Sequence, residues 1–270
     1  MYVLDADAQV RPDTLKRLWA HIDGDDVAAA QGGMIPAGPP ESFAAFYVAI
    51  ESLVHQRITL RGAARIGMTQ SLLGSNTLIR RKVLEEAGGF PEKTRLEDIE
   101  LSIALQNEGR RIAFTPEAHS TIVASPRVKH AMVQHRAWSR EFMSIASRWL
   151  WRILEGSGSL PRRIDRLIFA MGYADRIVLL VYLLCAIAGG IAGRAFAPWS
   201  FIVLVLALPA IQAPLALWLG RGVATEYAYL AFLPVGFAIE MATHLDAFRQ
   251  ALLGRRPEWT RTVRGSSPRD

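Results

Sequence analysis

Two long apolar runs in the C-terminal half constrain this chain most strongly. Residues 177–193, IVLLVYLLCAIAGGIAG, and residues 195–219, AFAPWSFIVLVLALPAIQAPLALWL, contain no charged side chain. A helix of about 20 such residues crosses the hydrocarbon core of a bilayer, so both runs are predicted membrane spans. A third run at residues 227–245 contains Glu240 and His244. An ionisable group at that depth is normally buried against protein or water, and we expect the same for these two.

The formal charge of +6 would suit a nucleic-acid partner, but many of the arginines flank the apolar segments. There they would meet anionic lipid headgroups, so a membrane surface is the expected partner and nucleic acid is not. Cys185 is the only cysteine, which excludes an intramolecular disulfide and a cysteine-based metal cluster. The first residues, MYVLDADAQV, lack the pattern of a secretory signal. We therefore expect the soluble half on the cytosolic side of an inner (plasma) membrane.

The number of spans stays open at this point. Three spans would place the arginine-rich tail, residues 249–270, outside the cell, against the positive-inside tendency. Two spans, with residues 227–245 re-entrant or lying at the surface, would keep that tail in the cytosol. Both arrangements are multi-pass.

The N-terminal half alternates strand and helix patterns. Apolar runs that end at turn residues indicate strands, and apolar residues at helical spacing that end at glycine indicate helices. Strands are predicted at residues 2–4 and 111–116, the second ending at Pro116, and helices at residues 11–22, with Asp13 as N-cap, 80–87 and 97–109.

A long amphipathic helix is predicted from residue 131 to residue 154. One stripe of this segment is apolar, and four arginines lie roughly opposite to it. Such a helix is expected to lie in the headgroup layer of a membrane. The stripe consists of Trp138, Phe142, Ile145, Trp149 and Ile153, and the arginines are Arg136, Arg140, Arg148 and Arg152.

Asp5 and Asp7 stand directly after the first apolar run. Two carboxylates at a strand end can share one hard divalent cation, directly or through water, and leave its other positions to diphosphate oxygens. A turn in which two aspartates merely cap a strand is the simpler explanation, because so short a pattern often matches by accident. The rest of the chain has to decide between these two explanations.

Further motifs follow in a fixed order. They are Gly74-Ser75-Asn76, Arg80-Arg81, Leu96-Glu97-Asp98, and Gln134 with Trp138. Together with Asp5-Ala6-Asp7, this order resembles the family 2 glycosyltransferases of GT-A type, in particular the membrane-anchored ones related to cellulose, chitin and hyaluronan synthases. The resemblance runs from Tyr2 to about Trp138, and it implies an α/β GT-A-like fold.

The resemblance implies roles for these residues. Asp5 and Asp7 match the aspartate motif that holds a divalent cation, Mg or Mn, and the sugar diphosphate. Glu97 and Asp98 match the last two residues of a T-E-D triplet, with Leu96 in place of threonine, and Asp98 would be the catalytic base. Capping of a helix N-terminus is the competing explanation for these two carboxylates.

The third family motif, Q-x-x-R-W, matches only in part. Gln134 and Trp138 fit, but Ala137 occupies the arginine position and Arg136 comes one residue early, about 100° around a helix. An arginine fork could neutralise the departing diphosphate, which alanine cannot do. Either Arg136 substitutes in closing over donor or acceptor, or the segment is one turn of the amphipathic helix. Arg148-Trp149 also reads R-W, with Ile145 where glutamine is needed.

Only four residues precede Asp5, whereas a GT-A domain binds its nucleotide with elements that come before the aspartate motif. We therefore expect a fragment that lacks the nucleotide-binding first half and continues into interfacial and transmembrane α-helices. The expected divisions are a partial GT-A catalytic domain at 1–130, amphipathic interfacial helices at 131–165, a transmembrane region of two or three spans at 166–248, and a basic tail at 249–270.

The favoured hypothesis is an inverting, metal-dependent glycosyltransferase. It would move a sugar from a nucleotide-sugar donor to a lipid or polysaccharide acceptor at the cytosolic membrane face. One alternative is a catalytically inactive membrane partner protein. The other is a phosphohydrolase of the haloacid dehalogenase type, which also begins with a strand and D-x-D but prefers Thr or Val where this chain has Gln9.

Overall fold

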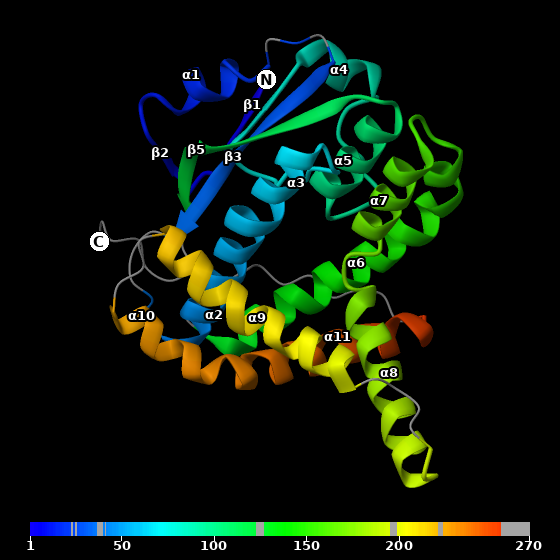
Figure 1. The fold of residues 1–270 in the computed structure, drawn as a ribbon. Helices are drawn as coiled ribbons and strands as arrows, with labels where there is room; N and C mark the ends of the chain where they lie inside the picture. Colours follow the sequence, from blue (N-terminus) through cyan, green and yellow to red (C-terminus); the bar gives the residue numbers. More distant parts are fainter. Residues whose placement is uncertain are drawn as a thin grey trace.

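The computed structural model describes residues 1–22, 24, 26–36, 40, 42–122, 127–194, 199–220 and 224–254. Within these residues an α/β half is followed by a helical half, and α8 extends away from the remainder (Figure 1). The first half contains β1 (Tyr2–Val3), β2 (Gln9–Val10), α1 (Thr14–Trp19), β3 (Val27–Pro36), α2 (Phe43–Val54), the π-helix η1 (His55–Leu60), α3 (Arg61–Ile66), β4 (Thr77–Ile79), α4 (Arg81–Glu86), α5 (Glu97–Asn107) and β5 (Arg111–Ile122). The second half contains α6 (Val128–Glu155), α7 (Leu160–Ala170), α8 (Ala174–Ile191), α9 (Trp199–Gly220), α10 (Ala224–Tyr229), the 3₁₀ helix η2 (Leu230–Phe232) and α11 (Leu233–Leu252).

The strands form one mixed sheet in the order β1-β4-β3-β5-β2. β3 and β5 run parallel, and the other neighbouring pairs are antiparallel. Because side chains alternate across a strand, Ala29 and Ala30 face opposite sides of the sheet. Ala29 packs with Leu101 of α5, whereas Ala30 packs with Leu18 of α1. The sheet therefore has α1 on one face and α4 with α5 on the other (Figure 1).

The predicted strand and helix positions in this half are largely confirmed, with two differences. Asp13 occupies the N-cap position of α1, but it makes no side-chain cap bond within the described residues. Its carboxylate pairs with Arg17 at 2.8 Å instead. The prediction that Pro116 ends a strand is wrong, because β5 continues to Ile122. Pro116 lies where the register with β3 is irregular, and a proline, which has no N–H, is tolerated at such a bulge.

Asn76 fastens three strands together from the start of β4. It is fully buried and adopts a φ of 54°. Its Nδ2 donates to the Gly33 carbonyl at 3.0 Å and to the Ala118 carbonyl at 2.7 Å. Its Oδ1 accepts from the Tyr2 hydroxyl at 2.8 Å. One side chain thus joins β1, β3 and β5.

Replacing Asn76 with alanine is expected to lower the free energy of unfolding by about 2 kcal/mol or more, because three buried partners lose their hydrogen bonds. Thermal unfolding of the detergent-solubilised protein, followed by circular dichroism, measures this. Asn107→Ala is the matched control, since Asn107 is half-buried and donates one bond, to the Arg152 carbonyl. Equal midpoints for the two variants would contradict the role given to Asn76.

The long helix predicted at residues 131–154 is present as α6, but its apolar stripe does not face a headgroup layer. Ile145 and Ile153 are fully buried, and Trp138, Phe142 and Trp149 pack on the same cluster. The cluster is completed by side chains of α5 and α7 and by Leu96, so the stripe is an internal contact surface. The division of the chain at residues 131–165 stays a prediction.

The C-terminal helices agree only in part with the predicted spans. Within the described residues, one helix, Glu226–Leu252, is long and apolar enough to cross a membrane. The first apolar run forms a shorter apolar helix, Arg176–Ile191, and the second forms another at Ala207–Gly220. Residues 195–198 of the second run and residues 255–270 of the tail lie outside the described residues.

The expectation that Glu240 and His244 are buried against protein is confirmed. Their exposed fractions are 7% and 0%. Glu240 accepts hydrogen bonds from the Tyr47 hydroxyl at 2.5 Å and from Arg176 at 3.0 Å, and it lies 3.2 Å from His244 Nε2. Because Tyr47 belongs to α2 and Arg176 to α8, these contacts dock α11 onto both helices.

Candidate active site

The turn that follows β1 carries Asp5 and Asp7, and both side chains are exposed. The turn is closed by a hydrogen bond from the Ala8 amide to the Asp5 carbonyl at 3.1 Å. The Asp5 amide donates to Ser75 Oγ at 2.9 Å. This bond fastens the acidic turn to the loop before β4, although the two segments are seventy positions apart in the sequence.

Gln31 of β3 supports that loop from beneath. It is fully buried, its Nε2 donates to the Ser75 carbonyl at 2.9 Å, and its Oε1 accepts from the Leu73 amide at 2.8 Å. Oε1 also accepts from the Thr77 hydroxyl at 2.6 Å. Sequence analysis did not identify Gln31. Its signal was a single large polar residue within the strand VAAAQGG, where a buried amide needs partners.

Asp98 stands in the first turn of α5 and approaches the same loop. Ser102 Oγ donates to the Asp98 carbonyl at 2.6 Å and accepts from the Leu72 amide at 2.8 Å. Gly74 has a φ of +75°, and a Cβ at this position would lie 3.3 Å from Asp98 Oδ2. Glycine therefore suits both the backbone and the close approach of the carboxylate. The acidic turn, the Gly74-Ser75 loop and Asp98 come together.

The electrostatic setting raises the pKa of Asp98 to about 7. Desolvation by the surrounding protein is the largest cause, and the negative charges of Glu97 and Asp5 raise the pKa further. Backbone amide hydrogen bonds at Ile99 and Asp98 act in the opposite direction. Sequence reasoning had left this balance open between the helix N-terminus and the neighbouring carboxylates. In the structure, burial and like charge outweigh the helix.

The residues of the incomplete third motif lie on α6 and point in different directions. Arg136 forms an ion pair with Asp246 of α11 at 3.0 Å. Trp138 packs against the cluster that contains Leu96 and Ile99, and its ring stacks on His135 at 5.3 Å. Gln134 is half-buried. Trp138 is thus brought to the start of α5, whereas Arg136 is held by α11.

The donor set of the acidic turn fits a hard divalent cation. Asp5 and Asp7 present carboxylate oxygens, which Mg²⁺ and Mn²⁺ prefer, on an exposed turn that a diphosphate can reach. Within the described part of the chain no group of three His, Cys, Asp or Glu residues could hold a metal ion. A cation here would therefore complete its shell with water or ligand oxygens, as expected where the metal arrives with a diphosphate.

Comparison with known proteins identifies the family to which this fold and site belong. Residues 1–219 match the family model described as glycosyl transferase family group 2. The match covers most of the chain, so the chain belongs to this family of glycosyltransferases. The alternative of a haloacid dehalogenase-type phosphohydrolase is therefore wrong.

Two curated relatives and one solved structure resemble the chain. It is 26% identical over 161 residues to a UDP-forming cellulose synthase, the catalytic protein of that enzyme in Dictyostelium discoideum, covering 57% of this chain and 14% of that protein. It is 28% identical over 127 residues to the probable glycosyltransferase YdaM of Bacillus subtilis, covering 47% and 29% respectively. The structure of the mannosyltransferase PcManGT from Pyrobaculum calidifontis, in complex with GDP-mannose and Mn²⁺, matches with a TM-score of 0.52 and 18% identity, covering 94% of this chain and 62% of that one. The chain thus spans less than a third of the length of either curated relative.

Proposed function

We propose that the chain is the catalytic part of an inverting, metal-dependent glycosyltransferase. It would transfer a sugar from a nucleotide-sugar donor to a lipid or polysaccharide acceptor at the cytosolic face of a membrane. The observation that carries the proposal is the convergence of Asp5, the Gly74-Ser75 loop and Asp98, in which Asp98 has a pKa of about 7. The solved mannosyltransferase of similar fold holds GDP-mannose and Mn²⁺ and supports a donor of this class.

Asp98 would act as the general base in this reaction. It would take the proton of an acceptor hydroxyl while that oxygen attacks the anomeric carbon, from the side opposite to the leaving diphosphate. A base with a pKa near the working pH is ionised often enough and still accepts a proton readily. Glu97 would tune Asp98 through its charge.

Asp5 and Asp7 would hold the cation and donor diphosphate. A bound Mg²⁺ or Mn²⁺ would supply charge that stabilises the departing diphosphate. Gln134 and Trp138 are assigned to closure over donor or acceptor, as the family motif implies. Arg136 would have to exchange its partner Asp246 for the ligand before it could take part in closure.

The helical half supports a membrane location. Exposed apolar side chains occur along α8, among them Val181, Leu184, Ile187 and Ile191. The candidate span Glu226–Leu252 lies in the same half. We assign α8, α9 and this segment to a multi-pass anchor in the inner (plasma) membrane.

The test is transfer of labelled sugar from UDP- and GDP-linked donors by membranes that contain the natural protein. We expect transfer to need Mg²⁺ or Mn²⁺ and to rise with pH through a midpoint of about 7, because the base must be ionised. The pH dependence of kcat/KM measures this midpoint.

Glu97→Gln is the control for the assignment of that midpoint. Removing the Glu97 charge removes one cause of the raised pKa, so the midpoint moves to lower pH. Lack of transfer with every donor, cation and pH would overturn the proposed function in favour of an inactive membrane partner.

A further inference from the structure

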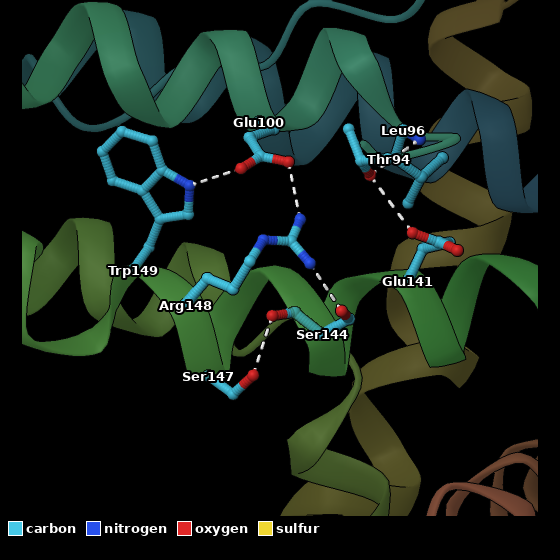
Figure 2. A network of polar contacts seen from close by, with 8 residues as sticks. All are labelled: Thr94, Leu96, Glu100, Glu141, Ser144, Ser147, Arg148 and Trp149. Carbon is cyan, nitrogen blue, oxygen red and sulfur yellow. Dashed lines mark hydrogen bonds and ion pairs between the residues drawn. The ribbon is translucent and has the colours of Figure 1, made fainter. Parts of the chain in front are cut away.

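Side chains of α6 hold the first turn of α5 through a buried carboxylate, Glu100 (Figure 2). Arg148 Nη2 donates to Glu100 Oε2 at 2.6 Å, and Trp149 Nε1 donates to Glu100 Oε1 at 2.8 Å. Both carboxylate oxygens are therefore engaged by adjacent residues of one helix. Glu100 is 9% exposed, so these bonds are largely shielded from water. Arg148 is itself held by Ser144 Oγ, to which its Nη1 donates at 2.6 Å.

A second contact lies on the other side of Asp98. The Thr94 hydroxyl donates to Glu141 Oε2 of α6 at 3.1 Å and accepts from the Leu96 amide at 3.2 Å (Figure 2). Thr94 precedes Asp98 by four positions, and Glu100 follows it by two. The segment that carries Asp98 is thus attached to α6 at both ends.

These attachments take the place of an ordinary helix cap. The N-cap residue of α5 is Leu96, and within the described residues it forms no side-chain cap bond. An acidic residue that only complemented the helix dipole would work equally well in solvent. Glu100 is instead buried and paired, an arrangement that contributes little net stability but strongly restricts geometry.

We propose that Glu100, Arg148 and Trp149 form a clamp that positions Asp98 for proton transfer. The inference rests on the proposed function, with Asp98 as the base. The three residues do not touch the reacting atoms, so they are positioning residues. The clamp gives the second R-W pair of the chain, Arg148-Trp149, a structural partner in α5. Because a misplacement of about 1 Å can cost about 100-fold in rate, loosening the clamp would lower kcat.

Arg148→Ala and Arg148→Lys test the clamp. Alanine removes the donor to Glu100, whereas lysine keeps the charge and can still donate to it. We expect Arg148→Ala to lower kcat by about 10–100-fold with the donor KM within about twofold of wild type. We expect Arg148→Lys to restore most of the rate. In Arg148→Ala the acid limb of the pH profile moves below 7, because a loosened α5 lets water reach the Asp98 carboxylate.

Two further variants keep the test decisive. Trp149→Phe removes one bond to Glu100 while keeping an aromatic ring in the core, so it is expected to fold and to show a smaller loss of kcat. Glu85→Ala is the matched control, because Glu85 forms an exposed ion pair with Arg81 on α4 at 2.9 Å. It is expected to leave both kcat and the pH midpoint unchanged.

The outcomes separate the clamp from the proposed function. Wild-type transfer with a midpoint near 7, together with unchanged kcat and midpoint in Arg148→Ala, would overturn the clamp alone. Equal losses in Arg148→Ala and Arg148→Lys would also overturn it, since the conservative variant would not rescue. Absence of transfer by the wild-type protein would overturn the proposed function and the clamp with it.

Discussion

Asp98→Asn is expected to lower the transfer rate by about 10²–10⁴-fold, the usual contribution of a general base. Asparagine has nearly the same shape as aspartate, so the contact with Gly74 and the first turn of α5 should persist. The amide cannot accept the proton of the acceptor hydroxyl. The measurement is kcat for labelled sugar transfer at pH 8, where the Asp98 carboxylate of the wild type is ionised.

Stability provides an independent check on the same variant. The pKa of Asp98 is raised by folding, so protonated Asp98 favours the folded state and this contribution is lost as pH rises through about 7. Asp98→Asn stays neutral and escapes that loss. Its thermal midpoint is therefore expected to exceed that of the wild type more at pH 8 than at pH 5. Retained transfer in Asp98→Asn would rule out the base assignment, and a pH-independent difference in midpoint would contradict the raised pKa.

Asp7→Ala is expected to weaken Mn²⁺ binding in the presence of a nucleoside diphosphate by at least about tenfold, the smallest loss usual for removing a partner of a metal site. Asp7 lies on an exposed turn whose neighbour Asp5 is held through its backbone by Ser75. The substitution should therefore leave the turn in place and remove only a ligand. Electron paramagnetic resonance of free Mn²⁺ measures binding without any need for transfer.

Asp13→Ala serves as the control for metal binding. Asp13 is another carboxylate near the N-terminus, but it pairs with Arg17 on α1. Its removal should leave Mn²⁺ affinity unchanged while Asp7→Ala lowers it. Equal affinities in the two variants would exclude the acidic turn as the cation site.

Part of the site could be predicted because its residues occur in short local patterns. A strand followed by Asp5 and Asp7, and a helix that begins at Glu97, depend on interactions within a few residues. Their order along the chain then indicated the glycosyltransferase family, which the family match confirms. Gln31 was missed because its partners, Leu73 and Ser75, are more than forty positions away.

The amphipathic helix shows where local pattern misleads. A stripe of Trp138, Ile145 and Ile153 needs an apolar neighbour, but the pattern does not distinguish a lipid layer from α5 and α7. The same holds for the arginines opposite, since Arg136 pairs with Asp246 and Arg148 with Glu100. Which partner covers a face depends on the packing of the whole chain.

The sequence by itself determined the strand and helix positions around the site, the acidic turn, and the apolar character of the C-terminal half, because these follow from backbone propensity and periodicity. Only the tertiary structure decided that Asp98 lies against Gly74, that its pKa is raised to about 7, and that α6 clamps α5 through Glu100. Desolvation and long-range hydrogen bonds depend on which distant segments meet, and that is set by packing rather than by neighbours along the chain.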